Sequence, residues 1–151
     1  MIALAQYGLV ISFAALAASV VRRRPYQAMV WLAPATLLAA GLDLIAGRLL
    51  FDTRPFVVLH VVPLIAHSGD NGFPSDHSTV AAFVAAALWF IDLPSAAVAT
   101  LAAVAIGLAR IYCLVHWPLD VTAGWCIGAL PAIAAGAGWR KYGSLAGHPR
   151  L

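Results

Sequence analysis

Charged residues are scarce in this chain of 151 residues: 10% are Asp, Glu, Lys or Arg, whereas 63% are hydrophobic. A soluble domain normally has about a quarter of its residues charged. A soluble helical domain also needs a polar face on each helix, but residues 2–21 and 28–46 carry almost no charge. The composition excludes an ordinary soluble protein and predicts a single membrane-embedded domain over residues 1–151.

Cysteine is also scarce, because the chain has only Cys113 and Cys126. Both lie in or next to apolar segments, and their spacing fits neither a metal site nor a disulfide framework. A cleaved signal peptide is not expected, since such peptides carry positive charge before the apolar stretch and the Arg22–Arg24 cluster follows it here. In a membrane protein the net charge of +3 first reports topology, so no nucleic-acid partner is expected.

Five apolar runs approach the roughly 20 residues that cross a bilayer, and they predict an all-α, polytopic membrane helical bundle. The predicted spans cover residues 2–21, 27–47, 77–91, 96–114 and 118–138. The third span reaches a useful length only if Ser75 and Asp76 form its first turn after Pro74. Residues 48–76 form a long outer connection, in which 56–65 is too short to span and is predicted to be re-entrant or interfacial.

Basic residues predict the orientation of these spans. Placing Arg22–Arg24 in the cytoplasm puts the N-terminus outside. Alternating spans then place Arg140, Lys141, Arg150 and the C-terminus in the cytoplasm. The same alternation brings three arginines to the outer face: Arg48, Arg54 and Arg110. Arginine near a membrane needs partners, so this convergence predicts a functional site, although separate snorkelling to lipid headgroups is the simpler alternative.

The same outer face collects Ser75, His77, His116 and Asp120. His116 and Asp120 are four residues apart, so on a helix the carboxylate would fix the tautomer of the imidazole and raise its basicity. The arginines offer forked donors to phosphoryl oxygens, and Ser75 with the free amides of a helix N-terminus adds an anion cradle. With His116 as nucleophile and His77 as proton donor, these residues suggest phosphoryl transfer through a covalent intermediate.

Two other interpretations compete with this one. His77, His116, Asp76 and Asp120 could hold a metal ion. This is less favoured because three nearby arginines repel a cation and no tight ligand motif is present, so neither metal nor cofactor is expected. The chain could also be a non-catalytic anion-binding or assembly subunit, but such a protein has no need for His116 with an aspartate one turn later.

Three short motifs carry a family resemblance: Arg54-Pro55, then Pro74-Ser75-Asp76-His77, then Arg110, five residues, His116, three residues and Asp120. Over residues 48–120 they resemble the three-part signature of the type 2 phosphatidic acid phosphatase and vanadium haloperoxidase superfamily. The resemblance implies that His116 is the nucleophile, Asp120 its orienting partner and His77 the general acid. It implies that three further residues bind phosphate: Arg54, Arg110 and Ser75.

The chain departs from this signature at several positions. The usual lysine of the first motif falls on Gly47, so Arg48 is expected to take its place in binding phosphate, in an altered register. Ala109 replaces the usual serine before the third-motif arginine, which removes one expected hydrogen bond to phosphate. Asp76 replaces the usual glycine, and Pro-Ser-Asp-His resembles the variant found in bacterial undecaprenyl-diphosphate phosphatases of the bacitracin-resistance type.

The resemblance implies a metal-independent lipid phosphatase in the bacterial inner membrane. Its expected reaction removes the terminal phosphate of a lipid-linked diphosphate, undecaprenyl diphosphate, on the periplasmic or external side. Phosphatidic acid and phosphatidylglycerol phosphate are the alternative substrates, and lipid phosphotransfer is an alternative reaction. The sequence does not decide between a monomer and a homo-oligomer.

The remaining polar residues carry weaker signals. Asp43, within the second span, is a candidate for function or for hydrogen-bonded packing. His60 and His67 are expected to be solvated histidines of the long connection rather than headgroup ligands. Asp52 and Asp70 are expected to be solvated loop or cap residues.

Overall fold

The computed structural model describes residues 1–24 and 26–142. Arg150, which the predicted topology places in the cytoplasm, lies outside the described residues. The helices, in chain order, are α1 (Ile2–Tyr7), α2 (Leu9–Arg23), α3 (Tyr26–Leu49), α4 (Pro55–Val58), α5 (Asp76–Leu88), α6 (Leu93–Tyr112) and α7 (Pro118–Tyr142). Within the described residues the only β pairing is an isolated bridge between Thr53 and Asn71. The predicted all-α bundle is confirmed.

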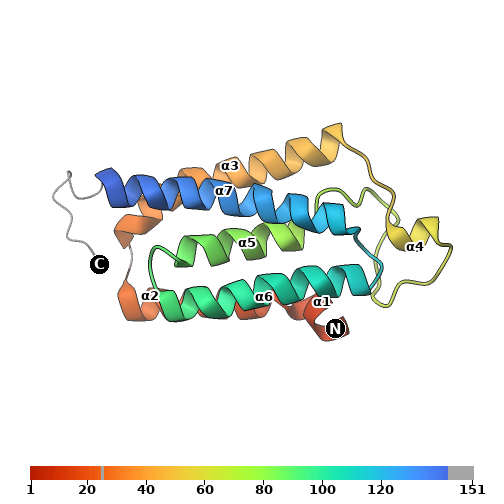
Figure 1. The fold of residues 1–151 in the computed structure, drawn as a ribbon, viewed down its shortest axis with the longest axis horizontal. Coiled ribbons are helices and arrows are strands. Elements are labelled where there is room, and N and C mark those ends of the chain that lie inside the picture. The colour runs from red at the N-terminus through yellow and green to blue at the C-terminus, as the bar shows by residue number, and fades with distance from the viewer. Residues whose placement is uncertain (25, 143–151) are drawn as a thin grey trace.

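The long helices lie side by side, with α5 in the middle (Figure 1). α5 contacts α2, α3, α6 and α7, and α1 and α2 follow one another along α6. The connection that contains α4 and the turn between α6 and α7 lie at one end of the bundle, whereas α2 and α7 end at the other (Figure 1). The motif-bearing segments and the basic helix ends are therefore separated by the length of the bundle.

Three described helices are long and apolar enough to cross a membrane: Ala28–Leu49, Leu93–Tyr112 and Pro118–Tyr142. α2 has 15 residues and α5 has 13, so the count of five spans stays a prediction.

The first predicted span divides at Gly8, where a Cβ would lie 2.5 Å from Cγ1 of Ile106. The predicted third span is wrong at its end, because α5 stops at Leu88 and the chain turns before residue 91.

α7 approaches α5 closely because glycines lie where the two helices meet. A Cβ on Gly124 would lie 2.7 Å from the carbonyl oxygen of Ser75, and one on Gly128 would overlap the backbone of Thr79. The first turns of the two helices are also joined directly, since the Ser75 amide donates to the carbonyl oxygen of Asp120 at 3.1 Å. The second and third motifs are thus held together by backbone contacts.

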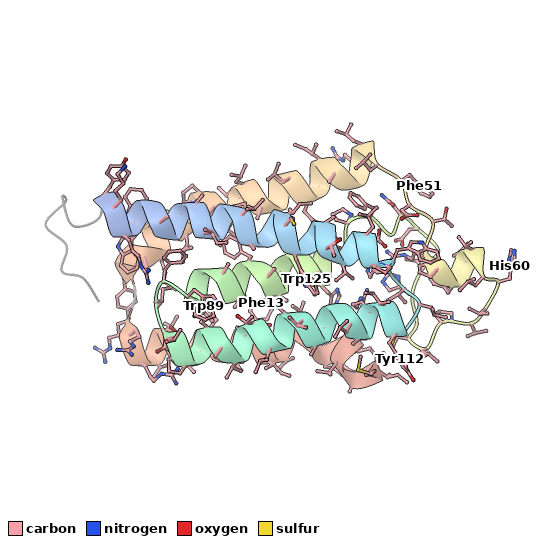
Figure 2. The ribbon with its side chains drawn as sticks, in the orientation of Figure 1. Phe13, Phe51, His60, Trp89, Tyr112 and Trp125 are labelled. Carbon is pink, nitrogen blue, oxygen red and sulfur yellow. The ribbon has the colours of Figure 1, made fainter. Side chains whose placement is uncertain are left out.

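The segment predicted to be re-entrant or interfacial contains only the four-residue helix α4. Several of its apolar side chains are exposed: Val58, Leu59, Val61, Val62 and Leu64. Figure 2 shows His60 at the outer tip of this segment, pointing away from the bundle. Its placement relative to a membrane stays a prediction.

Asp92 joins α2 to α6 at the opposite end of the bundle. Arg22 Nη2 donates to Asp92 Oδ2 at 2.5 Å, and Arg23 Nε donates to Oδ1 at 3.3 Å. The Ser95 hydroxyl and these arginines hold the pKa of Asp92 well below its usual range, so the carboxylate stays charged. Arg22 and Arg23, two members of the predicted cytoplasmic cluster, therefore also connect the end of α2 to the start of α6.

Candidate active site

The residues that carry the motifs meet at the end of the bundle that bears the long connection. A cavity of about 870 Å³ opens there between α2, α3, α5 and α6. Five of the predicted site residues line it: Arg48, Arg54, His77, Arg110 and His116. The other two, Ser75 and Asp120, are fully buried and do not line it.

His116 lies in the turn between α6 and α7 and is only 3% exposed. Its Nδ1 lies 2.8 Å from the carbonyl oxygen of Gly72 and 3.5 Å from Oδ2 of Asp120. Both neighbours are acceptors, so the proton belongs on Nδ1 and the lone pair on Nε2. Nε2 lies 3.2 Å from Nη2 of Arg110 and 3.4 Å from Nη1 of Arg54. The nitrogen that could attack phosphorus thus faces the arginines.

Asp120 is not the nearest partner of His116. α7 begins at Pro118, so His116 precedes the helix, and Oδ2 of Asp120 also accepts the Trp117 amide at 2.8 Å. The Gly72 carbonyl supplies the shorter contact, and no feature of the sequence marked it. A Cβ on Gly72 would lie 3.2 Å from the carbonyl oxygen of Asp52 and 3.3 Å from Cγ of Arg54, so a larger residue there would press on the backbone and on Arg54.

Burial lowers the pKa of His116 below its ordinary value. The nearby carboxylate of Asp120 raises this pKa, but burial together with the charges of Arg110 and Arg54 outweighs it. The neutral imidazole is therefore favoured at neutral pH, and this is the form that can act as a nucleophile.

Arg54 connects three segments around the cavity. Its Nε donates to Oδ1 of Asp70 at 2.9 Å, Nη1 to the carbonyl oxygen of Val115 at 2.9 Å, and Nη2 to that of Asn71 at 2.8 Å. Asp70 was expected to be solvated, and it is 62% exposed, but it forms an ion pair with Arg54. A hydrogen bond from Ser68 and the contact with Arg54 lower the pKa of Asp70.

Arg110 lies in the last turn of α6 and is 3% exposed. Its Nη1 donates to the carbonyl oxygen of Ala5 at 3.1 Å, while Nη2 contacts His67 and His116, two other residues of the cavity wall. Nε has no hydrogen-bond partner among the described residues. Arg48, in the last turn of α3, lines the cavity with an exposed side chain. The arginines thus reach the cavity from three different segments.

The second motif divides between the cavity and the core. His77, in the first turn of α5, is half-buried and lines the cavity. Ser75 precedes that helix, and its hydroxyl accepts a hydrogen bond from Ser78 Oγ at 3.0 Å within the core. The predicted contact between the Ser75 hydroxyl and phosphate would therefore need a different side-chain orientation, and it stays a prediction.

Three polar residues of the cavity wall were not predicted to belong to the site. His67 contacts Arg110 at 3.0 Å, although it was expected to be solvated. Asp43 Oδ1 accepts the Thr79 hydroxyl at 2.7 Å. Asn71 fixes the connection by donating to the carbonyl oxygens of Gly47, Leu50 and Phe73. Only Asp43 carried a signal in the sequence, as an ionisable residue inside an apolar run.

The residues considered for a metal site, His77, His116, Asp76 and Asp120, do not form a cluster of metal ligands in the described part of the chain. Over residues 1–24 and 26–142, no group of three or more His, Cys, Asp or Glu side chains is placed to hold a metal ion. The cavity is instead lined by three guanidinium groups, which favour an anion. A neutral imidazole nitrogen facing these groups is suited to attack on a bound phosphoryl group.

Curated proteins similar to this chain come from several bacteria. The chain is 37% identical over 98 residues to YbjG of Escherichia coli strain K12, provisionally named an undecaprenyl-diphosphatase, covering 64% of this chain and 50% of that protein. It is 36% identical over 100 residues to the bacitracin transport permease protein BcrC of Bacillus licheniformis, covering 66% and 49%. It is 34% identical over 93 residues to the undecaprenyl-diphosphatase BcrC of Bacillus subtilis strain 168, covering 56% and 48%.

These alignments and a family match define what the chain is related to. The chain spans about half the length of the curated relatives it matches. No solved structure matches it. The model of the PAP2 superfamily matches residues 28–141, which is well over half of the chain. The chain therefore belongs to the PAP2 superfamily.

Proposed function

We propose that the protein is a metal-independent lipid phosphatase that converts undecaprenyl diphosphate to undecaprenyl phosphate. The observation that carries this proposal is the two-part wall of the cavity. In one part of the wall, His116 and the guanidinium groups of Arg48, Arg54 and Arg110 are suited to bind a phosphate headgroup. The other part is mainly apolar, with Thr36, Asp43 and Thr79 as its polar members. Its apolar side chains come from α2, α3 and α5: Phe13, Leu16, Ala39, Ala40, Leu44, Val80, Phe83 and Val84.

This division suits a phosphate that carries a long apolar tail. The tail can stay against the helices and the surrounding lipid, while the headgroup reaches the arginines without the protein enclosing the whole substrate. The names of two relatives and the Pro-Ser-Asp-His motif favour a polyprenyl diphosphate over phosphatidic acid or phosphatidylglycerol phosphate. A non-catalytic anion-binding subunit would not need a neutral histidine facing the arginines.

In the proposed mechanism, Nε2 of His116 attacks the terminal phosphorus and forms an N–P bond. The P–O bond to the bridging oxygen breaks, and His77 gives a proton to the leaving undecaprenyl phosphate. A water oxygen then attacks the phosphorus while His77 accepts a proton from it; the N–P bond breaks, its electron pair returns to Nε2 of His116, and inorganic phosphate leaves. Arg54 and Arg110 neutralise the charge on the phosphoryl oxygens in both steps.

We place this reaction on the periplasmic or external side of the bacterial inner membrane, with the C-terminus in the cytoplasm. The separation of the cavity from the basic ends of α2 and α7 supports this orientation, because cytoplasmic segments carry the excess of Lys and Arg.

Cysteine labelling tests this orientation. With the native cysteines replaced, His60→Cys should react with a membrane-impermeant thiol reagent in intact cells, and Lys141→Cys should react only after lysis. The reverse labelling pattern would invert the topology.

Phosphate release by the purified protein in detergent tests the proposed activity. The two substrates are undecaprenyl diphosphate and phosphatidic acid, each with excess chelator. Chelator-resistant release that is faster from undecaprenyl diphosphate is expected. A preference for phosphatidic acid would change the substrate, and phosphate moved to a lipid acceptor instead of water would change the reaction. Activity lost with chelator would overturn metal independence, and binding of phosphate without hydrolysis of either lipid would favour the anion-binding alternative.

A further inference from the structure

His67 lines the cavity and belongs to the irregular part of the long connection. Its Nε2 lies 3.0 Å from Nη2 of Arg110, and the same Nη2 lies 3.2 Å from Nε2 of His116. The two imidazole rings stand nearly perpendicular, at 81°, with their centroids 6.2 Å apart. One NH₂ group of Arg110 is therefore shared between two imidazole nitrogens.

These contacts determine the charge state of His67. A guanidinium group has only donors, so Nε2 of His67 must accept, which leaves the proton on Nδ1 near the Ser68 carbonyl oxygen at 3.3 Å. Burial, followed by the charge of Arg54, lowers the pKa of His67 and favours this neutral form. The titratable and charged groups that face His67 come from several segments: Arg54, Asp70, His77, Arg110 and His116.

The Arg110–His67 contact matters because little else orients the cavity side of this guanidinium. Nη1 is fixed by the carbonyl oxygen of Ala5, and Nε has no partner among the described residues. Nη2 lies within hydrogen-bonding distance of Nε2 of both His67 and His116, so each of its two hydrogens has one acceptor. If a phosphoryl oxygen replaced His116 as acceptor, Nε2 of His116 would be free to attack while His67 still held Arg110.

We propose that His67 is a positioning residue of the active site, which holds Arg110 for phosphate binding by accepting a hydrogen bond from Nη2. This inference rests on the proposed phosphatase function, and it adds a residue outside the three motifs to the proposed active site. His67 acts through Arg110, so its loss is expected to weaken phosphate binding more than the chemical step. Protonated His67 cannot accept from Arg110 and repels it.

Two substitutions separate the hydrogen bond from simple packing. His67→Leu keeps side-chain volume but removes the acceptor, whereas His67→Gln keeps a neutral acceptor at every pH. Exposed His60, on the same connection, gives the matched controls His60→Leu and His60→Gln. The measurements are kcat and KM for undecaprenyl diphosphate, vanadate binding as a phosphate mimic, and thermal unfolding in detergent.

His67→Leu is expected to lower kcat/KM by about 10–100-fold, mainly through KM, and to weaken vanadate binding similarly. His67→Gln should recover most of both, and its kcat/KM should persist to lower pH, because one protonation that disrupts the site has been removed. The His60 variants should match wild type.

Three results would contradict this role of His67. One is wild-type kinetics and vanadate binding in His67→Leu. Another is a stably folded His67→Gln that is as impaired as His67→Leu. The third is an unchanged acid limb of the pH profile in His67→Gln. If the wild type hydrolyses no lipid phosphate, the proposed function fails, and vanadate binding still tests the contact between His67 and Arg110.

Discussion

Replacing His116 with asparagine is expected to reduce hydrolysis of undecaprenyl diphosphate by about 10⁴-fold or more, because no nucleophile remains. Nε2 of His116 faces two arginines from 3.2 and 3.4 Å, while Nδ1 is held by the Gly72 carbonyl at 2.8 Å. Asparagine can still donate one hydrogen bond towards Gly72, so it removes the attacking nitrogen with the least disturbance of the turn. Phosphate release and thermal unfolding in detergent are the measurements.

The His116→Asn variant should unfold close to the wild-type temperature and still bind vanadate. His116→Ala should be equally inactive but less stable, because it also leaves the Gly72 carbonyl oxygen without its partner. Turnover by a folded His116→Asn protein above about 1% of wild type would contradict the assignment of this residue as nucleophile.

Arg54→Lys should lower kcat/KM by about 10²–10³-fold, although it keeps the positive charge. The guanidinium contacts Asp70, Asn71 and Val115 through three different nitrogens and also faces His116. A lysine has one compact ammonium group, so it cannot serve all these acceptors together with a phosphate. Unsatisfied buried carbonyl groups should also cost about 1–3 kcal/mol in the free energy of unfolding.

The control is Arg24→Lys, an exposed residue at the opposite end of the bundle, which should leave activity and stability unchanged. Arg48→Lys provides a graded comparison, because exposed Arg48 lines the cavity and should show a smaller loss. Near-wild-type kcat/KM in Arg54→Lys would mean that charge alone suffices at this position and that the network around it is dispensable.

The length of the apolar runs predicted the long helices best, because an uninterrupted apolar run near 20 residues has few alternatives to a membrane helix. The start of α5 was also predictable, since Pro74 and Ser75 precede it as expected for a helix N-terminus. Its end at Leu88 was not, because apolar residues continue into the turn and only packing in the bundle decides where the helix stops. The break at Gly8 likewise depends on the approach of Ile106 from α6.

The motifs identified the arginines and histidines that the cavity brings together, but not the residues that hold them. Gly72 and His67 lie in an irregular segment, where spacing along the chain does not predict spatial neighbours. Their positions depend on long-range contacts, such as the Gly72 amide donating to Asp52 at 2.8 Å and the ion pair between Arg54 and Asp70. The chemical roles assigned to the motif residues stay predictions.

The most direct test of a phosphohistidine mechanism is rapid acid-free quenching of wild-type protein turning over undecaprenyl diphosphate labelled in the terminal phosphate. We expect label bound covalently to His116, stable in base, lost in acid and absent from His116→Asn. Turnover without protein-bound label at any quench time, or label that persists in His116→Asn, would contradict attack by His116.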